Sequence, residues 1–385
     1  TTIAAANPGS DLATVITALV TLPTVDALTD ALLQIAPASG FVGISQESFN
    51  TTRQFQKVWL ENLYRFREHC CMDDCCNLVE RVCCDPCGKN PTDAKSSPMC
   101  RKCIDCEGPR IWATGFGSHS HQNPRDFLNG YKANTYGGTI AFDAPLVCGL
   151  RAGVGAGYAF TDLDESRFDN ATDINNYEGT FYLSYTSYSW FVNTGFSFGW
   201  DQFYGTRNIN YTGVSRTAHA KYNGQEYTGF FATGYQKYFN CFEFTPFATV
   251  IATYQHIGDF TETGADSLNL HINEQNYTYV ESGLGLQIAY LFRTCHGVYV
   301  PEVHSIWLHD FYQNRLNVDA IFTGLGAGAG SFPNTGPGIG RNTWDIGGSI
   351  TFMISRTFSI MVNYDYNRSK AYYSHQGLLE LSYSF

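Results

Sequence analysis

The 13 cysteines of this 385-residue sequence are the residues whose side chains could do the most distinctive chemistry. Ten of them fall in one short segment, at Cys70, Cys71, Cys75, Cys76, Cys83, Cys84, Cys87, Cys100, Cys103 and Cys106. The segment 70–108 is otherwise rich in Asp, Lys, Pro and Gly, so it offers no hydrophobic core. Disulfide bonds or a bound metal are therefore expected to hold it together.

Four of these cysteines have the spacing of a tetrahedral zinc site. Cys84 and Cys87 form one Cys-x2-Cys pair, and Cys100 and Cys103 form a second pair after twelve intervening residues. Each pair would supply two thiolates at about 2.3 Å from the ion. A single zinc ion uses far fewer thiols than the segment contains, which favours disulfides. Zinc is the alternative, and no other cofactor is expected.

The apolar pattern of residues 1–69 predicts helices that precede this segment. The third helix, from Ser48 to His69, is the clearest, with an apolar face formed by Phe55, Trp59, Leu63 and Phe66. Its remaining faces carry Arg53, Lys57, Arg65 and Arg67. Two interpretations are open. The helix either packs on the surface of a domain, or it lies inside a polar pore where its basic residues meet acidic wall residues.

From Pro109 onward, a two-residue period replaces the helical one. In the final strand, Leu379, Leu381, Tyr383 and Phe385 share one face, and Glu380, Ser382 and Ser384 share the other. Similar alternation predicts twelve strands, approximately at 110–118, 132–146, 150–163, 176–188, 190–206, 220–238, 242–260, 277–292, 299–312, 343–355, 357–367 and 376–385.

The connections between these strands alternate in length. Those after odd-numbered strands are long or polar, with 313–342 the longest, and those after even-numbered strands have only a few residues. An even strand count with long loops on one rim and tight turns on the other is typical of an outer-membrane barrel. We therefore predict an all-β membrane protein, a twelve-stranded antiparallel transmembrane β-barrel. A soluble β-sandwich is the alternative.

The composition agrees with this class and excludes others. The 25 Tyr, 28 Phe and 37 Gly are typical of transmembrane strands, and no apolar run reaches the roughly 18 residues of a transmembrane helix. The net charge of −11 argues against a nucleic-acid partner, because phosphate binding needs a basic face. The chain starts at Thr1 without a basic-then-apolar leader, as expected after removal of a signal peptide.

Residues 109–385 resemble the autotransporter β-domain family. The collinear motifs are IWATGFG at 111–117, NTYGG at 134–138, LRAGVGAGYAFTD at 150–162, YEGTFYLSY at 177–185, FTPFATVIATYQHIGDFTETGADSLNL at 244–270, ESGLGLQIAYLF at 281–292 and the closing LELSYSF. The resemblance implies a Gram-negative outer-membrane barrel that the barrel-assembly machinery recognises through Phe385. It also implies a pore helix within 11–69. The cysteine-rich insert departs from the family pattern, and so does the lack of a β-helical passenger within these residues.

The barrel prediction gives the other three cysteines a common position. Cys148, Cys241 and Cys295 fall in the tight turns after the second, sixth and eighth strands. If the long loops are extracellular, these turns and the segment 70–108 are periplasmic. Because 13 is odd, at least one cysteine cannot pair within the chain. The cysteine content resembles, in composition alone, that of the disulfide-cross-linked outer-membrane proteins of Chlamydia-like bacteria.

These observations predict three parts: a helical segment 1–69, a cysteine-rich segment 70–108 and a membrane barrel 109–385. The expected function is a structural barrel, embedded in outer-membrane lipid and joined by disulfides to neighbouring envelope proteins or to a second copy of itself. The alternatives are a translocator for a passenger absent from this chain and a general porin.

An enzyme is not expected. His296, His304 and His309 lie near Glu302 and Asp310 in the sequence, without a recognisable catalytic pattern. A polar lumen accounts equally well for the acidic residues predicted to line the pore, which are Glu243, Glu281, Asp345, Asp365 and Glu380.

Overall fold

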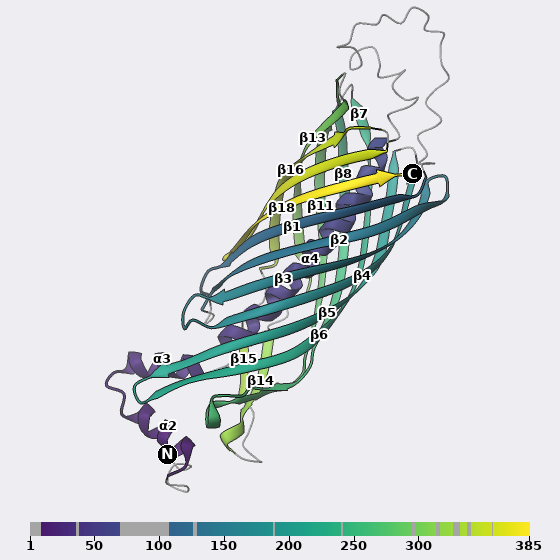
Figure 1. Ribbon diagram of the computed structural model, residues 1–385. Coiled ribbons are helices and arrows are strands. Elements are labelled where there is room, and N and C mark those ends of the chain that lie inside the picture. Colours follow the sequence, from purple (N-terminus) through teal and green to yellow (C-terminus); the bar gives the residue numbers. More distant parts are fainter. Residues whose placement is uncertain are drawn as a thin grey trace, which may run out of the picture.

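The computed structural model describes residues 9–35, 38–69, 108–125, 129–187, 189–239, 242–294, 297–312, 316–325, 332–336, 340–355 and 357–385. Strands of this part form one closed antiparallel barrel with a helix running through it (Figure 1). Among the described helices, none is long and apolar enough to cross a membrane.

Twelve strands close the barrel, which confirms the predicted fold. Each pairs with its neighbour along the chain, and the last pairs with the first, from Arg110 opposite Ser384 to Gln122 opposite Tyr372. The strands are β1 (Arg110–Gln122), β2 (Tyr131–Val147), β3 (Leu150–Glu165), β4 (Ala171–Ser187), β5 (Trp190–Tyr211), β6 (Val214–Tyr235), β8 (Phe242–Ile257), β11 (Gln275–Tyr290), β13 (Gly297–Asp310), β16 (Asn342–Met353), β17 (Phe358–Ser369) and β18 (Tyr372–Ser384).

The two rims of the barrel differ. We call the rim that carries Phe385 the near rim and the opposite one the far rim. The near rim has short turns such as 148–149, whereas the far rim carries the longest connection, 311–341. The predicted alternation was wrong at two places on the far rim: the connections 212–213 and 370–371 are two-residue turns. At both, the strands continue through the polar residues expected to form loops.

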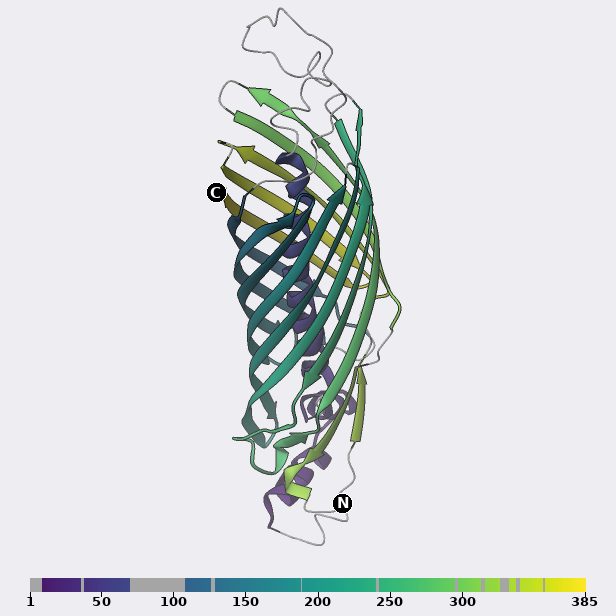
Figure 2. The same cartoon turned by 90° about the vertical axis from the view of Figure 1, so that its right-hand side faces the viewer.

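The far rim also carries structure that the sequence did not predict. Segments of two connections, 258–274 and 311–341, form a second, four-stranded sheet in the order β15-β14-β10-β9 (Figure 2). Its strands are β9 (Phe260–Thr261), β10 (Leu270–Ile272), β14 (Leu316–Phe322) and β15 (Phe332–Gly336), accompanied by the short helices η1 (Asp266–Leu268) and η2 (Thr323–Leu325). Two further short strands, β7 (Lys237–Phe239) and β12 (Phe292–Thr294), lie at the near rim.

The period-two pattern separates the two faces of the wall as expected. Along β18, Glu380, Ser382 and Ser384 are buried on the lumen side. Leu379 and Leu381 are exposed on the outside. Since the outward side chains are apolar and the inward ones are polar, the barrel has the face arrangement of a protein that lipid surrounds.

In the part of the chain that the structure describes, three helices precede the barrel: α2 (Asp11–Val20), α3 (Val25–Ile35) and α4 (Ala38–His69). The first two dock on the far rim, where their apolar residues pack against Ile209 and Val214. Hydrogen bonds from the Arg216 guanidinium, one of them 2.8 Å long, hold the pKa of Asp11 well below its usual value. Helix α4 starts at Ala38 rather than at the predicted Ser48 and lies within the barrel (Figure 2).

Glycines in the wall make room for the helix. A Cβ atom on Gly155 would lie 2.7 Å from the indole of Trp59, and one on Gly157 would lie 2.5 Å from the ring of Phe55. On β1, which β2 separates from β3, Trp112 lies 5.3 Å from Trp59 and Phe116 lies 5.4 Å from Phe55, between ring centroids. Helix α4 therefore packs closely against the side of the barrel formed by β1 and β3.

This packing predicts the effect of enlarging Gly157. In Gly157→Val, the new side chain overlaps Phe55, so we expect a loss of about 1–3 kcal/mol in unfolding free energy, as for other overpacked cores. Equilibrium unfolding of the refolded barrel in guanidinium measures it. The added change Phe55→Ala should remove most of the effect of the valine.

Gly179→Val is the matched control, because a Cβ there meets no atom within 4 Å. Equal destabilisation by both glycine variants, or an undiminished valine effect in the Phe55→Ala background, would contradict the predicted packing.

Candidate functional site: the helix in the barrel lumen

Helix α4 runs from the far rim to the near rim, and most of its side chains between 41 and 63 are buried. Its apolar residues form two patches against the wall: Phe41, Ile44 and Phe49 toward the far rim, and Phe55, Val58, Trp59, Leu60 and Leu63 toward the near rim. The polar residues between them are also buried, and each needs a hydrogen-bond partner to offset the loss of water.

Glu47 joins the helix to the far part of the wall. Its carboxylate accepts hydrogen bonds from Ser120 Oγ at 2.9 Å, from Tyr131 Oη at 3.2 Å and from Asn50 Nδ2 at 3.1 Å. Two of these donors come from β1 and β2, so this single side chain fixes the helix against two strands.

Two wall carboxylates converge on the middle of the helix. Ser48 Oγ lies 2.9 Å from Asp201 Oδ2 and 3.0 Å from Glu226 Oε1. Glu226 also accepts from Thr52 on the next helical turn and from Gln255 Nε2 at 2.6 Å. Since Ser48 has one hydroxyl proton, it can donate to one of the two carboxylates at a time.

A third carboxylate, that of Glu178 on β4, accepts hydrogen bonds from the side of the helix that faces this strand. Glu178 accepts from Trp59 Nε1 at 2.6 Å and from Gln56 Nε2 at 3.2 Å. Trp59 therefore serves both the apolar patch and the hydrogen-bond network, a combination that suits the indole ring.

Two basic residues of α4, Arg53 and Lys57, face the opposite side, where they meet acidic residues as the pore interpretation predicted. Lys57 Nζ lies 2.6 Å from Asp345 and 2.9 Å from Asp365, and Arg53 lies 3.3 Å from Glu281. All three carboxylates are buried in the lumen. Because each charge has lost most of its hydration, the pairs hold the helix only as long as both partners are present.

A cavity of about 110 Å³ lies on this side of α4, next to Arg53 and Lys57. Three groups beside it, Glu61, His304 and Asp365, place one ligand atom each within 4.8 Å of the others and could hold a cation. Lys57 Nζ already contacts Asp365 and lies 3.8 Å from Glu61. Its ammonium group thus compensates the charge that a metal ion would otherwise neutralise.

A further cluster at the near rim was missed by sequence reasoning. Asp143 accepts from Arg110 at 3.0 Å, Arg151 at 2.8 Å, Trp112 Nε1 at 3.2 Å and Tyr182 Oη at 2.8 Å. The sequence did contain a signal for this cluster, because β1, β2 and β3 each carry an inward charged residue near this rim, and the charges on adjacent strands have opposite sign.

The structure describes one of the predicted cysteine sites. Cys148 is exposed in the turn 148–149 at the near rim. The other twelve cysteines, including the zinc candidates Cys84, Cys87, Cys100 and Cys103, lie outside the described residues. Their pairing and their side of the membrane stay predictions.

The histidines do not form a common site. His304 points into the lumen, where Nε2 lies 2.9 Å from Asp365, whereas His309 points outward and contacts Asn342. His296 lies outside the described residues, as do the side chains of Arg65 and Arg67.

Two other positions need comment. The stretch 195–199, GFSFG, has the spacing of a nucleophile motif, but it lies within β5 and not at the strand-to-helix turn that such a motif needs. At the chain end, the backbone N–H of Phe385 donates to Pro109 O at 2.9 Å. Recognition of Phe385 during assembly stays a prediction.

Similar proteins of known sequence are rickettsial. The chain is 26% identical over 288 residues to outer membrane protein A of Rickettsia conorii, a match that covers 71% of this chain and 14% of that relative. It is 23% identical over 287 residues to outer membrane protein B of Rickettsia prowazekii, covering 71% of this chain and 17% of that protein. The chain thus spans less than a fifth of the length of these relatives.

Solved structures share the fold. The translocator domain of autotransporter NalP from Neisseria meningitidis aligns with a TM-score of 0.60 at 15% identity, covering 73% of this chain and 90% of that one. The β-domain of the Bordetella autotransporter BrkA aligns with a TM-score of 0.52 at 15% identity, covering 72% and 100%. The family model described as the autotransporter beta-domain matches residues 111–365. The chain belongs to the autotransporter β-domain family.

Proposed function

We propose that this outer-membrane barrel presents the chain N-terminal to α4 outside the cell and is sealed by α4. The observation that carries the proposal is the direction of the helix. Its N-terminal end lies at the far rim with α2 and α3, and its C-terminal end lies at the near rim, beside the start of β1 (Figure 1). In this arrangement, a segment attached before α2 emerges where the long connection lies.

Contacts at the far rim support a fixed exit point. The Arg207 guanidinium donates to Gln34 O at 3.0 Å, and the backbone N–H of Asn210 donates to Gln34 Oε1 at 2.6 Å. Asp11 accepts from the backbone N–H of Ser267 at 3.0 Å. These bonds join both short helices to the rim, so the N-terminal segment leaves from a defined place.

The filled lumen favours this function over the porin alternative. Porins that conduct freely have wider barrels with an aqueous channel. Here α4 occupies the lumen of a twelve-stranded barrel and leaves beside it a cavity of about 110 Å³.

The first experiment tests the seal. We expect the intact chain in planar lipid bilayers to show little steady current, and deletion of 38–69 to give a stable open channel. Lys57→Met should raise the frequency of openings, because it removes the ammonium group that Asp345 and Asp365 share. Breaking a buried pair costs about 3–5 kcal/mol.

Lys221→Met, on the outer face of β6, is the matched control and should behave as the intact chain does. Large, steady currents from the intact chain would contradict the seal and support the porin.

The second experiment tests the orientation. A folded reporter domain joined before residue 9 should be detected by antibody on intact cells that express the chain. An epitope inserted in the turn 354–357 at the near rim should become accessible only after the outer membrane is permeabilised. The reverse pattern of labelling would refute the proposed orientation.

A second role, as a disulfide-linked component of the envelope, is favoured by the position of the cysteine-rich segment 70–108, which joins α4 to β1 at the near rim. Cys148, exposed at the same rim, is itself disulfide-bonded. If the near rim is periplasmic, the thiols gather in an oxidising compartment. A disulfide there would bind the barrel to a neighbouring protein or to another copy more durably than a small surface contact does.

Electrophoresis tests this second role. Native envelopes alkylated at lysis should show high-mass species without reductant, and these should collapse to the 42.9 kDa monomer after reduction. Substituting Cys148, Cys241 and Cys295 by Ser should thin that ladder, whereas Ser187→Ala at the same rim should leave it unchanged. A monomer without reductant that carries about one zinc ion would instead identify the Cys-x2-Cys pairs as ligands.

A further inference from the structure

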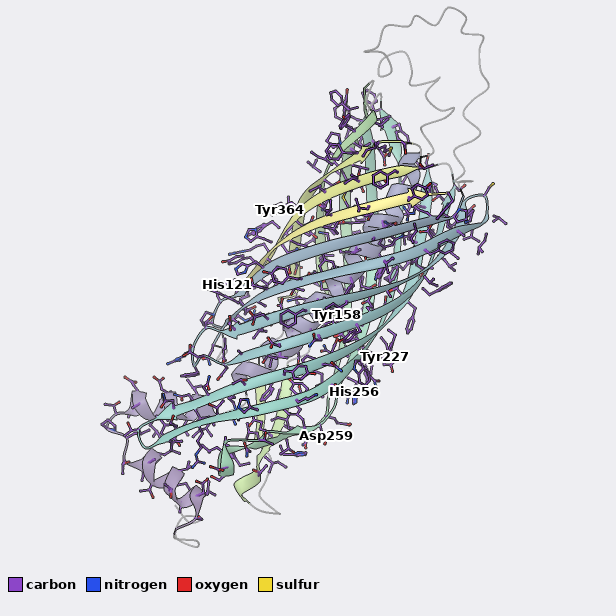
Figure 3. The ribbon with its side chains drawn as sticks, in the orientation of Figure 1. His121, Tyr158, Tyr227, His256, Asp259 and Tyr364 are labelled. Carbon is purple, nitrogen blue, oxygen red and sulfur yellow. The ribbon has the colours of Figure 1, made fainter. Side chains whose placement is uncertain are left out.

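The outer face of the barrel changes character toward the far rim on β17, β18, β1 and β2. On the near-rim side of this level, the outward side chains are apolar and exposed, for example Val362, Leu379 and Ile111. On the far-rim side lies a group that we name the basic sector, which consists of Arg368, His375, His119, His121 and Lys132. Figure 3 shows His121 and Tyr364 on the same flank of the wall, directed away from the lumen.

The strand register places these residues in two adjoining rows. In the row closer to the far rim, Arg368 is opposite Tyr373, Tyr373 is opposite His121, and His121 is opposite Lys132. In the other row, His119 is opposite His375. Directly opposed residues have Cβ atoms about 4.5–5.5 Å apart. Five basic or titratable groups from four adjacent strands therefore share one patch of the outer surface.

Tyrosine side chains contact the residues of the basic sector and hold them in place. The Arg368 guanidinium carbon lies 5.9 Å from the ring centroid of Tyr373, and the His121 ring lies 5.2 Å from it. Tyr364 Oη lies 2.7 Å from His375 Nδ1. Such rings are typical of the membrane interface, where an apolar body meets a polar edge.

Two histidines are held so that protonation changes what they offer to a ligand. His119 Nδ1 lies 2.8 Å from Asn134 Oδ1, and His121 Nε2 lies 3.1 Å from Asn123 Oδ1. An amide oxygen can only accept, so those nitrogens act as donors. The second nitrogen of each ring is then an acceptor when the ring is neutral and a donor when it is protonated. A phosphate oxygen is bound only by the protonated form.

The neighbouring charges favour an anion. At the described outward positions of β17, β18, β1 and β2 there is no carboxylate. The nearest acidic residues in the two rows are Asp162, opposite Asn134, and Asp164, opposite Lys132, both on β3. The groups that face the three histidines across the strands are Tyr364, Tyr366, Arg368, Tyr373, Lys132 and Asn134.

We propose that the basic sector binds the phosphate groups of anionic membrane lipids in the leaflet at the far rim. The depth suits a headgroup, because the patch begins where the apolar band ends. The charge suits a phosphate, because Arg368 and Lys132 supply permanent cations and the three histidines add proton-dependent ones. The inference depends on the residence of the barrel in a membrane and not on its role in presenting a segment or in sealing.

The natural reporter is a pair of tryptophans beside the sector. Trp344 is opposite Arg368, and Trp307 is opposite Trp344. We would reconstitute the full chain with Trp190→Phe and Trp200→Phe in phosphatidylcholine vesicles that contain brominated phosphatidylglycerol or brominated phosphatidylcholine. Quenching of tryptophan fluorescence then gives the relative affinity of the two lipids at the sector.

At about pH 5.5, where histidines carry protons, we expect roughly a fivefold preference for phosphatidylglycerol, falling toward pH 8. Arg368→Gln with Lys132→Gln should lower the preference at both pH values. His119→Gln, His121→Gln and His375→Gln together should remove its pH dependence. His256→Gln with Lys221→Gln, on a different part of the outer face, is the matched control and should change neither.

Equal quenching by the two lipids at both pH values would overturn the proposal, as would the same loss in the matched control. Loss of the preference on adding inorganic phosphate, but not chloride of equal ionic strength, would identify a soluble anion as the ligand. That outcome would also overturn the assignment to lipid.

Discussion

Buried charge inside a closed wall is the constraint on which the rest of this structure depends. The ammonium group of Lys57 lies between Asp345 and Asp365, and Arg53 faces Glu281, all within the lumen. A wall with these carboxylates and no helix would need water or ions in their place, and a helix with these cations needs acidic partners. Wall and helix therefore specify each other, and the glycines of β3 complete the fit on the opposite side.

The barrel could be predicted because its signal is local and repeated. Alternation in β18 alone fits many folds, but twelve strands with the same pattern need a surface between lipid and water. The lengths of the strands were less predictable. Residues 207–211 and 214–219 extend a hairpin beyond the expected strand ends, because pairing between β5 and β6 satisfies their backbone although several of their side chains are polar. The sheet containing β14 forms through contacts with distant segments, which no local pattern reveals.

The candidate site, like the barrel, could be predicted from the sequence only in part. Arg53 and Lys57 are four residues apart, so the sequence alone indicates that they share a face of the helix. The identity of their partners depends on the register of strands far along the chain, as with Glu281 and Asp345. The cluster around Asp143 combines residues from four strands and was not visible in any one of them. Trp59 was predicted as apolar, and its bond to Glu178 appears only once the helix has its orientation in the barrel.

The passage of α4 through a closed ring of strands separates two properties that are often considered together. The seal depends on hydrogen bonds and ion pairs that thermal motion can open. Retention of the N-terminal segment depends on covalent continuity from α4 to β1, and on a wall closed by the pairing of β18 with β1. A barrel whose helix slips in the lumen leaks but keeps hold of what it carries. Under the proposed function, detachment requires cutting the chain, so the lifetime of the segment at the surface would be set by proteolysis and not by the strength of the contacts inside.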